Sequence, residues 1–118
     1  MKEPRAVLVV DDSAPVRTAV ANILRGAGFT VLEAAASDEA LAIVASQNLS
    51  LVIADLYLDE AASGVALLAQ AIELRPGLKG VVMSGAFISS QKHIPFPFLM
   101  KPFMPQALID LAAELTAE

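Results

Sequence analysis

The sequence predicts a doubly wound α/β domain, in which a parallel sheet lies between two layers of helices. Two observations lead to this prediction. Short apolar runs rich in β-branched residues alternate along the chain with longer segments whose apolar residues recur at helical spacing. Runs of this kind are typical of strands that are buried on both faces. Because strand and helix alternate throughout, parallel strands joined by crossover helices are favoured.

In the first half of the chain, the apolar runs predict three strands, at Arg5–Val10, Phe29–Ala34 and Leu49–Ala54. Ser13 is a suitable N-cap for the helix between the first two strands, and Pro15 is tolerated in the first helical turn. Gly26 and Gly28 are predicted to end this helix. Ser37 is predicted to cap the second helix, which precedes the third strand.

In the second half, the same pattern predicts two more strands, at Leu78–Ser84 and Phe98–Met100. A predicted helix begins at Gly64, runs to about Leu74 and connects the third strand to the fourth. The last predicted helix begins at Pro105, where Met104 offers no side-chain acceptor and can only be a weak cap.

The connection between the last two predicted strands breaks the alternation. Residues 85–97 contain no apolar stripe of normal helical length. Pro95 and Pro97 add to this, because proline disfavours helical geometry at the residue before it. We therefore expect the fourth helix of the pattern to be short or missing.

The composition is typical of one folded domain, with 118 residues of which 56% are hydrophobic. We expect residues 1–118 to form a single domain without an attached effector domain. The net charge is −5 and the 8 basic residues are scattered along the chain, which argues against a nucleic-acid surface. No apolar run is long enough for a membrane span or a signal peptide, and the absence of cysteine excludes disulfides and thiolate sites. We expect a cytoplasmic protein that contacts neither nucleic acid nor membrane.

Five polar residues stand at the predicted carboxyl ends of the strands: Asp11, Asp12, Asp55, Ser84 and Lys101. In a doubly wound sheet with the order 2-1-3-4-5, functional residues gather at these ends, and the first and third strands are neighbours. Three carboxylates at one edge repel each other unless a cation such as Mg²⁺ binds among them. With the metal, one carboxylate can attack phosphorus, while a lysine neutralises charge and a serine donates a hydrogen bond. These residue types together predict a phosphoryl-acceptor site.

Four motifs in chain order, VLVVDDS, LVIADLYL, VVMSGA and FLMKPF, resemble those of the receiver domain of bacterial two-component response regulators, a CheY-like and flavodoxin-like fold. The resemblance covers essentially the whole chain. It implies that Asp55 is the phosphoacceptor and that Ser84 and Lys101 assist the transfer. It also implies a Mg²⁺ site formed by Asp11, Asp12, Asp55 and the backbone carbonyl of Tyr57.

Some positions depart from the common pattern of that family. Asp59 stands where most members have proline, and the loop to Gly64 carries one extra residue. The segments SGAF and PFLMKPF resemble a subgroup of single-domain receivers with a degenerate fourth helix, whose partners tend to be histidine kinases of the HWE type. The implied switch residues are Ser84 with either Phe98, at the usual aromatic position, or Phe87, at the position of the subgroup.

The sequence therefore predicts a phosphorylation-dependent signalling receiver within a two-component phosphorelay. Asp55 is expected to take a phosphoryl group from a histidine kinase or a histidine phosphotransfer protein. Phosphorylation should switch a surface that binds a downstream protein, with residues 85–97 as the mobile element. The domain is not expected to be an enzyme beyond its own phosphorylation and dephosphorylation, and we expect a monomer or a weak dimer. His93 is expected to be an exposed loop residue.

Two alternatives belong to other functional classes. The first is a receiver-like docking scaffold that is not phosphorylated. The second is an enzyme on the same fold, either a flavodoxin or a phosphatase with an aspartate nucleophile. Asp11 and Asp12 would repel the phosphate of a flavin, and the phosphatase pattern needs a second aspartate at the position that Ala14 occupies here.

Overall fold

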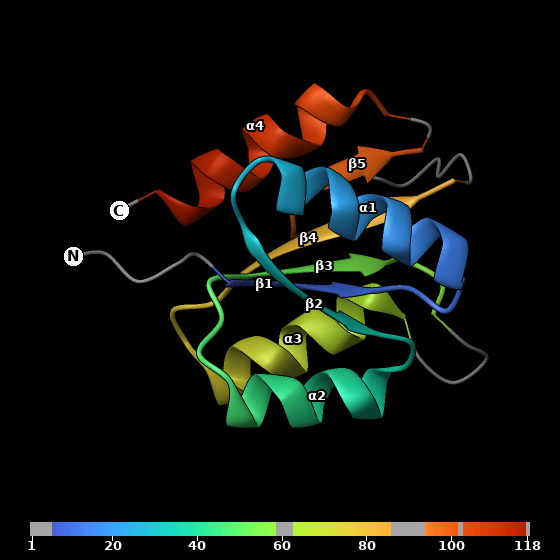
Figure 1. Cartoon of the computed structure of the whole chain (residues 1–118). Helices are drawn as coiled ribbons and strands as arrows, with labels where there is room; N and C mark the ends of the chain where they lie inside the picture. The colour runs from blue at the N-terminus through green and yellow to red at the C-terminus, as the bar shows by residue number, and fades with distance from the viewer. Residues whose placement is uncertain (1–5, 59–62, 86–93, 102, 118) are drawn as a thin grey trace.

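A five-stranded parallel sheet with the strand order β2-β1-β3-β4-β5 forms the centre of the protein (Figure 1). The structure is a computed structural model that describes residues 6–58, 63–85, 94–101 and 103–117. Its elements are β1 (Ala6–Val10), α1 (Ala14–Gly26), β2 (Thr30–Ala34), α2 (Ser37–Ser46), β3 (Leu51–Asp55), α3 (Gly64–Leu74), β4 (Lys79–Ser84), β5 (Phe98–Met100) and α4 (Pro105–Thr116). This order and these parallel pairings confirm the predicted fold class.

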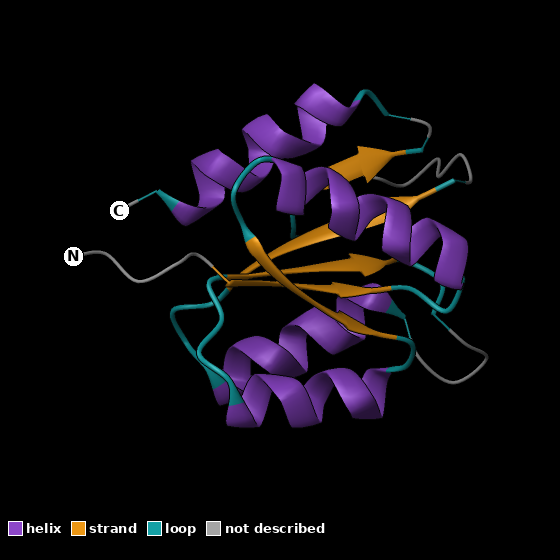
Figure 2. Ribbon diagram, in the orientation of Figure 1, coloured by secondary structure: helices purple, strands orange, loops and turns teal. Residues whose placement is uncertain are grey.

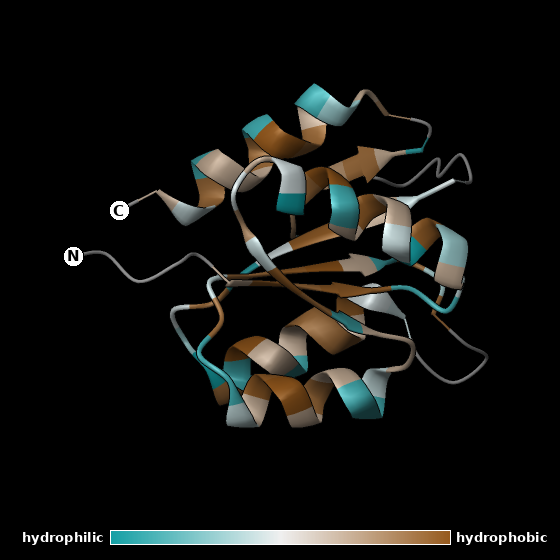
Figure 3. Ribbon diagram, in the orientation of Figure 1, coloured by the Kyte–Doolittle hydropathy of each residue, from teal (hydrophilic) through white to brown (hydrophobic). Residues whose placement is uncertain are grey.

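Two helices cover each face of the sheet, α1 and α4 on one side and α2 and α3 on the other (Figures 1 and 2). Residues 7–10 of β1 are completely buried, because both faces of this strand are covered. Leu8 and Val10 pack in the core beneath α2 and α3, whereas Val7 and Val9 pack in the core beneath α1 and α4. Figure 3 shows the apolar character of β1 and of its neighbour β3. Each such buried side chain contributes roughly 1.5–3 kcal/mol to folding.

The register of the strands brings their carboxyl ends to one edge of the sheet. Val10 at the end of β1 pairs with Ala34 of β2 and with Ala54 of β3. Asp55, the last residue of β3, pairs with Met83 of β4. Residues that directly follow these strands therefore lie close together, although they are far apart in the sequence.

The predicted helix boundaries are largely confirmed at the two proline-containing N-termini. Ser13 is the N-cap of α1, but its side chain accepts no capping hydrogen bond. Met104 is the N-cap of α4 and provides no side-chain bond, as its apolar side chain predicts. After α1 the chain turns at Gly28, whose φ of 99° lies in the left-handed region that favours glycine.

The prediction that Ser37 caps α2 is wrong, because the helix already includes Ser37 and its N-cap is Ala36. Glu39 in the first helical turn accepts a hydrogen bond from the backbone N–H of Ala35 at 2.8 Å, which holds the chain ahead of the helix. The hydroxyl of Ser37 is buried, and it has no hydrogen-bond partner among the residues that the structure describes. The carboxylate of Glu39, and not the hydroxyl of Ser37, thus bonds to the backbone ahead of α2.

Strand boundaries differ from the prediction by one or two residues. The third strand begins at Leu51 and includes Asp55, and the fourth begins at Lys79. Arg5, predicted to begin the first strand, lies outside the described residues. None of the helices in the described part of the chain is long and apolar enough to cross a membrane.

The connection between β4 and β5 is described at Gly85 and at residues 94–97, and these residues contain no helix. The expectation of a short or missing fourth helix also concerns residues 86–93, which lie outside the described part of the chain. Phe87 and His93 belong to that segment, and so does most of the expected mobile element.

Candidate functional site

The five predicted site residues lie at the carboxyl edge of the sheet. Asp11 and Asp12 follow β1, Asp55 ends β3, Ser84 ends β4 and Lys101 follows β5. The strand order makes β1, β3, β4 and β5 successive neighbours. This edge is where doubly wound sheets place their binding sites.

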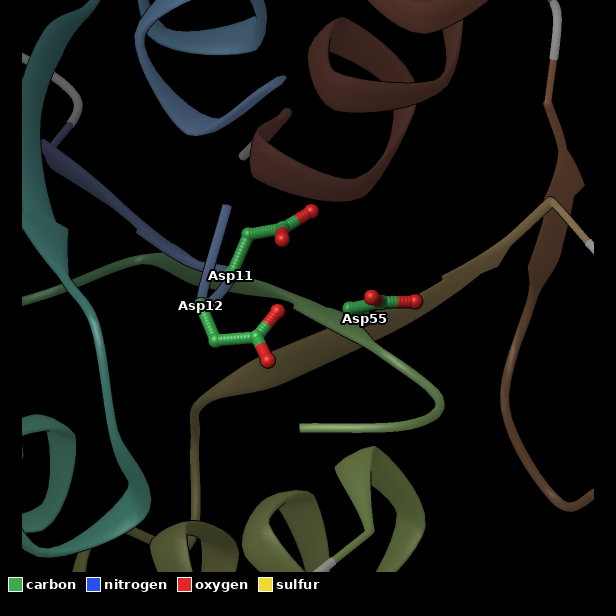
Figure 4. A group of neighbouring side chains, drawn as sticks. All are labelled: Asp11, Asp12 and Asp55. Carbon is green, nitrogen blue, oxygen red and sulfur yellow. The ribbon is translucent and has the colours of Figure 1, made fainter. Parts of the chain in front are cut away.

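Three carboxylates converge at this edge. One oxygen from each of Asp11, Asp12 and Asp55 lies within 4.8 Å of the other two, a spacing that allows a shared metal ion. Figure 4 shows the side chains of Asp11 and Asp12 diverging from consecutive residues, with Asp55 beside them. Asp11 is 1% exposed, whereas Asp12 is exposed and can admit a ligand from solvent. The donor set consists of oxygen atoms only, which fits the preference of Mg²⁺.

The environment of Asp55 disfavours its charged form. Burial raises the pKa of Asp55 above its ordinary value, and the carboxylates of Asp11 and Asp12 raise it further. Lys101 and a backbone hydrogen bond from Tyr57 act in the opposite direction but do not outweigh burial. A cation bound among the three carboxylates would lower this pKa, because it stabilises the ionised form.

Lys101 provides positive charge beside the carboxylates. Its Nζ lies 3.1 Å from Oδ2 of Asp11 and 3.9 Å from Oδ2 of Asp55. The backbone N–H of Lys101 donates to the carbonyl oxygen of Ser84 at 2.7 Å, so the backbone just after β5 is bonded to the end of β4. A Cβ added at Gly85 would lie 3.9 Å from the lysine stem, so the aliphatic part of Lys101 packs along this turn. The ammonium is thereby held at the edge of the site.

Ser84 ends β4, the strand next to β3, and Phe98 begins β5, which pairs with β4 at the edge of the sheet. Ser84 is buried, with 1% of its surface exposed. Phe98 is half-buried and packs against the core beneath α2 and α3. Of the two predicted switch aromatics, only Phe98 lies in the described part of the chain, since Phe87 does not.

The loop after β3 folds back onto Asp55. Tyr57, whose carbonyl is a predicted metal ligand, forms an isolated antiparallel bridge with Ser63. The N–H of Gly64 donates to the carbonyl oxygen of Leu56 at 2.9 Å. A Cβ at Gly64 would collide with the backbone carbonyl of Asp55, so only glycine allows this close approach. Asp59 lies outside the described residues.

Two residues next to the site are not predicted by the motifs. For Gly64, the sequence predicts only that a helix begins there. Arg17, in the first turn of α1, donates a hydrogen bond from Nη1 to the backbone carbonyl of Asp11 at 2.9 Å. The only available signal for Arg17 is a basic residue six positions after Asp11, which a surface helix could equally carry.

Comparison with known proteins agrees with this geometry. The family model of the response regulator receiver domain matches residues 7–113. The response regulator NtrX-like protein of Rickettsia bellii is 31% identical over 119 residues, which cover 93% of this chain and 25% of the relative. The transcriptional regulatory protein GlrR of Escherichia coli is 30% identical over 124 residues, which cover 98% of this chain and 28% of the relative. The chain thus spans about a quarter of the length of these curated relatives.

Solved structures share the fold. A CheY-like response regulator receiver domain protein from Methanospirillum hungatei has a TM-score of 0.85 and 28% identity, covering 95% of this chain and 93% of that one. A response regulator protein from Burkholderia pseudomallei, which holds a phosphorylated aspartic acid, a calcium ion and citrate, has a TM-score of 0.80 and 24% identity. That alignment covers 96% of this chain and 71% of the Burkholderia protein. The family match, the fold and the acidic edge of the sheet agree, and the chain belongs to the response regulator receiver domain family of two-component signalling.

Proposed function

We propose that this chain, as one receiver domain over residues 1–118, accepts a phosphoryl group on Asp55 from a histidine kinase or a histidine phosphotransfer protein. The observation that carries the proposal is the convergence of three carboxylates and one ammonium at a single edge of the sheet. In the transfer, a P–O bond to a carboxylate oxygen of Asp55 forms as the P–N bond to the imidazole of the donor breaks. The imidazole nitrogen leaves with the electron pair and takes up a proton.

Asp11, Asp12, Asp55 and the backbone carbonyl of Tyr57 would hold Mg²⁺ at this site. The metal supplies positive charge that neutralises the phosphoryl oxygens during transfer. The support is chemical, because the three side chains present oxygen ligands close enough to share an ion. The bridge between Tyr57 and Ser63 restrains the backbone that would present the fourth ligand.

Lys101 and Ser84 would assist from the side of β4 and β5. The ammonium of Lys101 lies within 4 Å of Asp55 at its present position, and it can neutralise charge on a phosphoryl group attached there. Ser84 ends the strand next to β3 and would donate a hydrogen bond to a phosphoryl oxygen. Neither role requires turnover of a separate substrate, so the domain would catalyse only its own phosphorylation and dephosphorylation.

The output we propose is a change of surface on β4, β5 and the connection between them. Phosphorylation would shift Ser84 inward and favour one packing of Phe98 or Phe87, so that a downstream protein binds one state better than the other. The backbone bond from Lys101 to Ser84 couples the two strand ends through which this shift would pass. We further propose that the domain acts in the cytoplasm, as a monomer or weak dimer, without direct contact to nucleic acid or membrane.

Labelling with a small phosphodonor tests the assignment of Asp55. The protein is incubated with acetyl phosphate and Mg²⁺, and the phosphorylated fraction is measured by intact mass. We expect Asp55→Asn to abolish labelling, whereas Asp110→Asn, which removes an exposed carboxylate on α4, should label like the unmodified protein. Equal labelling of Asp55→Asn would refute the site.

The docking scaffold is the outcome to be separated from this proposal. A scaffold would show neither labelling by acetyl phosphate nor a Mg²⁺-dependent spectral change on addition of beryllofluoride, which mimics the phosphoryl group. Tyr57 is the only tyrosine and there is no tryptophan, so intrinsic fluorescence reports on the loop beside Asp55. A change in this signal that requires both Mg²⁺ and beryllofluoride supports the phosphoacceptor function.

A further inference from the structure

Arg17 lies beside the acid pair without touching its carboxylates. It belongs to the first turn of α1, where its backbone N–H donates to the carbonyl oxygen of Ser13 at 2.9 Å. The side chain is 18% exposed and turns back toward the carboxyl end of β1. An arginine in this position carries a planar fork of donors that can serve two acceptors at once.

The guanidinium of Arg17 bonds to two groups that are far apart in the sequence. Nη1 donates to the backbone carbonyl oxygen of Asp11 at 2.9 Å, and Nε donates to Oε1 of Glu33 on β2 at 3.2 Å. The carbonyl of Asp11 belongs to the peptide group that joins Asp11 to Asp12. Arg17 therefore restrains the plane of the peptide between two of the proposed metal ligands.

Asp12 depends on this restraint more than Asp11 does. Asp11 is held at several points, since its N–H donates to Ala34, and its carboxylate accepts from the N–H of Ser13 and from Lys101. Asp12 is exposed, and the peptide that precedes it sets the direction in which its Cα–Cβ bond points. Rotation of that peptide would move the Asp12 carboxylate away from Asp55.

Glu33 keeps Arg17 in this orientation. Its Oε1 accepts from Arg17 and from the hydroxyl of Thr18, both at 3.2 Å, and its Oε2 accepts from Arg25 at 3.1 Å. Burial alone would raise the pKa of Glu33, but these hydrogen bonds outweigh burial and hold the pKa below its ordinary value. Glu33 is thus ionised at neutral pH, and from β2 its carboxylate faces the guanidinium of Arg17.

We infer that Arg17, oriented by Glu33, is a positioning residue for Mg²⁺ binding, because it presets the peptide between Asp11 and Asp12. The inference rests on the proposed function, in which these two aspartates hold the metal. Arg17 differs from Lys101, whose ammonium bonds to the carboxylate of Asp11, one of the proposed metal ligands. On the acid pair, Arg17 bonds to the backbone carbonyl of Asp11 and to neither carboxylate, so this contact can persist when the metal is bound.

Arg25 provides a matched control on the same helix. Like Arg17, it pairs with Glu33 and donates a second bond to a backbone carbonyl, in this case that of Val31 at 2.9 Å. Arg17→Met and Arg25→Met therefore remove the same charge, one ion pair to the same carboxylate and one bond to a backbone carbonyl. They differ in two respects: only the carbonyl bonded by Arg17 belongs to the acidic site, and Arg25 also donates to Oδ1 of Asn22 on its own helix at 3.3 Å.

The test is a Mg²⁺ titration of the metal-free full chain, followed by the fluorescence of Tyr57 and by calorimetry. We expect Arg17→Met to raise the Mg²⁺ dissociation constant about 10-fold or more, the usual effect of removing a group that orients a metal ligand. Arg25→Met should leave the constant close to that of the unmodified chain, and Arg17→Lys should be intermediate, because an ammonium lacks the fork. Equal constants for Arg17→Met and Arg25→Met would overturn the positioning role.

A second measurement does not involve the metal. In the metal-free protein, amide nitrogen relaxation at Asp12 and Ser13 should show increased mobility in Arg17→Met and not in Arg25→Met. If Arg17→Met does not fold, Glu33→Gln takes its place and should raise the dissociation constant in the same direction, and an unchanged constant overturns the inference. Absence of saturable Mg²⁺ binding by the unmodified chain would overturn the proposed function itself, which separates the two failures.

Discussion

The ammonium of Lys101 pairs with the buried carboxylate of Asp11, and Nζ lies 3.1 Å from Oδ2. This is the shorter of its two described ion pairs, since the distance to Oδ2 of Asp55 is 3.9 Å. Asp11 is 1% exposed, and a buried carboxylate without a counterion would be costly. In the metal-free protein Lys101 therefore provides the charge that we expect Mg²⁺ to provide when it binds.

Removal of the Lys101 ammonium should destabilise the metal-free protein. Lys101→Met leaves the Asp11 carboxylate without its cation, and we expect the free energy of unfolding to fall by about 1–3 kcal/mol. Saturating Mg²⁺ should restore part of this loss, because the metal supplies positive charge at the same carboxylate. Urea unfolding with and without Mg²⁺ measures both effects. Lys79→Met removes an exposed lysine at the far end of β4 and should change stability little in either condition.

The raised pKa of Asp55 makes stability depend on pH in a defined direction. Because the folded-state pKa lies above the unfolded one, Asp55 favours the fold below the unfolded pKa, and this contribution is lost as the pH rises through the folded pKa. At neutral pH without metal, Asp55→Asn should therefore be more stable than the unmodified chain. The difference in free energy of unfolding between Asp55→Asn and the unmodified chain should vanish in acid and become smaller on addition of Mg²⁺. Urea unfolding over a pH series in a chelator checks this, and a less stable Asp55→Asn at neutral pH would contradict it.

Glu33 should show the opposite pH dependence. Burial acts to raise its pKa, but the hydrogen bonds from Arg25, Thr18 and Arg17 hold the pKa below its ordinary value. Its contribution to stability is present above the unfolded pKa and is lost as the pH falls through the folded one. Glu33→Gln should thus be less stable than the unmodified chain at neutral pH and equally stable in strong acid.

Thermal unfolding across this pH range gives the comparison for Glu33→Gln. Glu114→Gln removes an exposed carboxylate of α4 and is the control, which should change stability little at neutral pH. High salt should reduce the effect at Glu33, because ions screen pairs that are partly exposed. An effect at neutral pH that persists unchanged in strong acid would contradict the electrostatic role.

Glycine at position 64 should be required for both stability and the site. The Cβ of Gly64→Ala would meet the backbone carbonyl of Asp55, and relief of this clash needs a backbone shift that costs about 1–3 kcal/mol. We expect a lower unfolding midpoint and weaker Mg²⁺ binding, because the displaced backbone carries Asp55, one of the proposed metal ligands. Gly26→Ala is the control, since nothing lies within 4 Å of its added Cβ and α1 should be unchanged or slightly more stable. Equal midpoints for the two variants would contradict the close approach.

Much of this protein follows from periodicity and position along the chain. Fully apolar runs such as the one ending at Val10 predict strands buried on both faces, and their alternation with helices predicts the parallel sheet. Parallel strands all point the same way, so residues that follow them must meet at one edge. That argument alone predicts that Asp11, Asp55 and Lys101 lie close together, and the structure confirms their proximity. Their roles in phosphoryl transfer stay predictions.

Helix starts were less predictable because several polar groups compete for the same backbone donors. Ser37 has the residue type of a cap, yet Glu39 satisfies the chain ahead of the helix and Ser37 becomes part of it. The local sequence shows which polar side chains could bond to the backbone N–H groups at a helix start. Which of them does so depends on the direction in which each side chain packs. Ser13 at the N-cap of α1 also lacks a side-chain capping bond, and Pro15 in the first helical turn has no N–H to donate to it.

Apolar periodicity and the alternation of strands and helices can be recognised in short stretches of sequence, and they were enough to predict the layered α/β fold and the polar residues at the carboxyl edge of its sheet. Three contacts became visible in the packed structure alone: Lys101 pairs more closely with Asp11 than with Asp55, Gly64 abuts the backbone of Asp55, and Arg17 connects Glu33 to the acid pair. Each of these contacts joins segments from different elements. Distances of a few ångströms between such segments depend on how the sheet and helices pack, which no local pattern encodes.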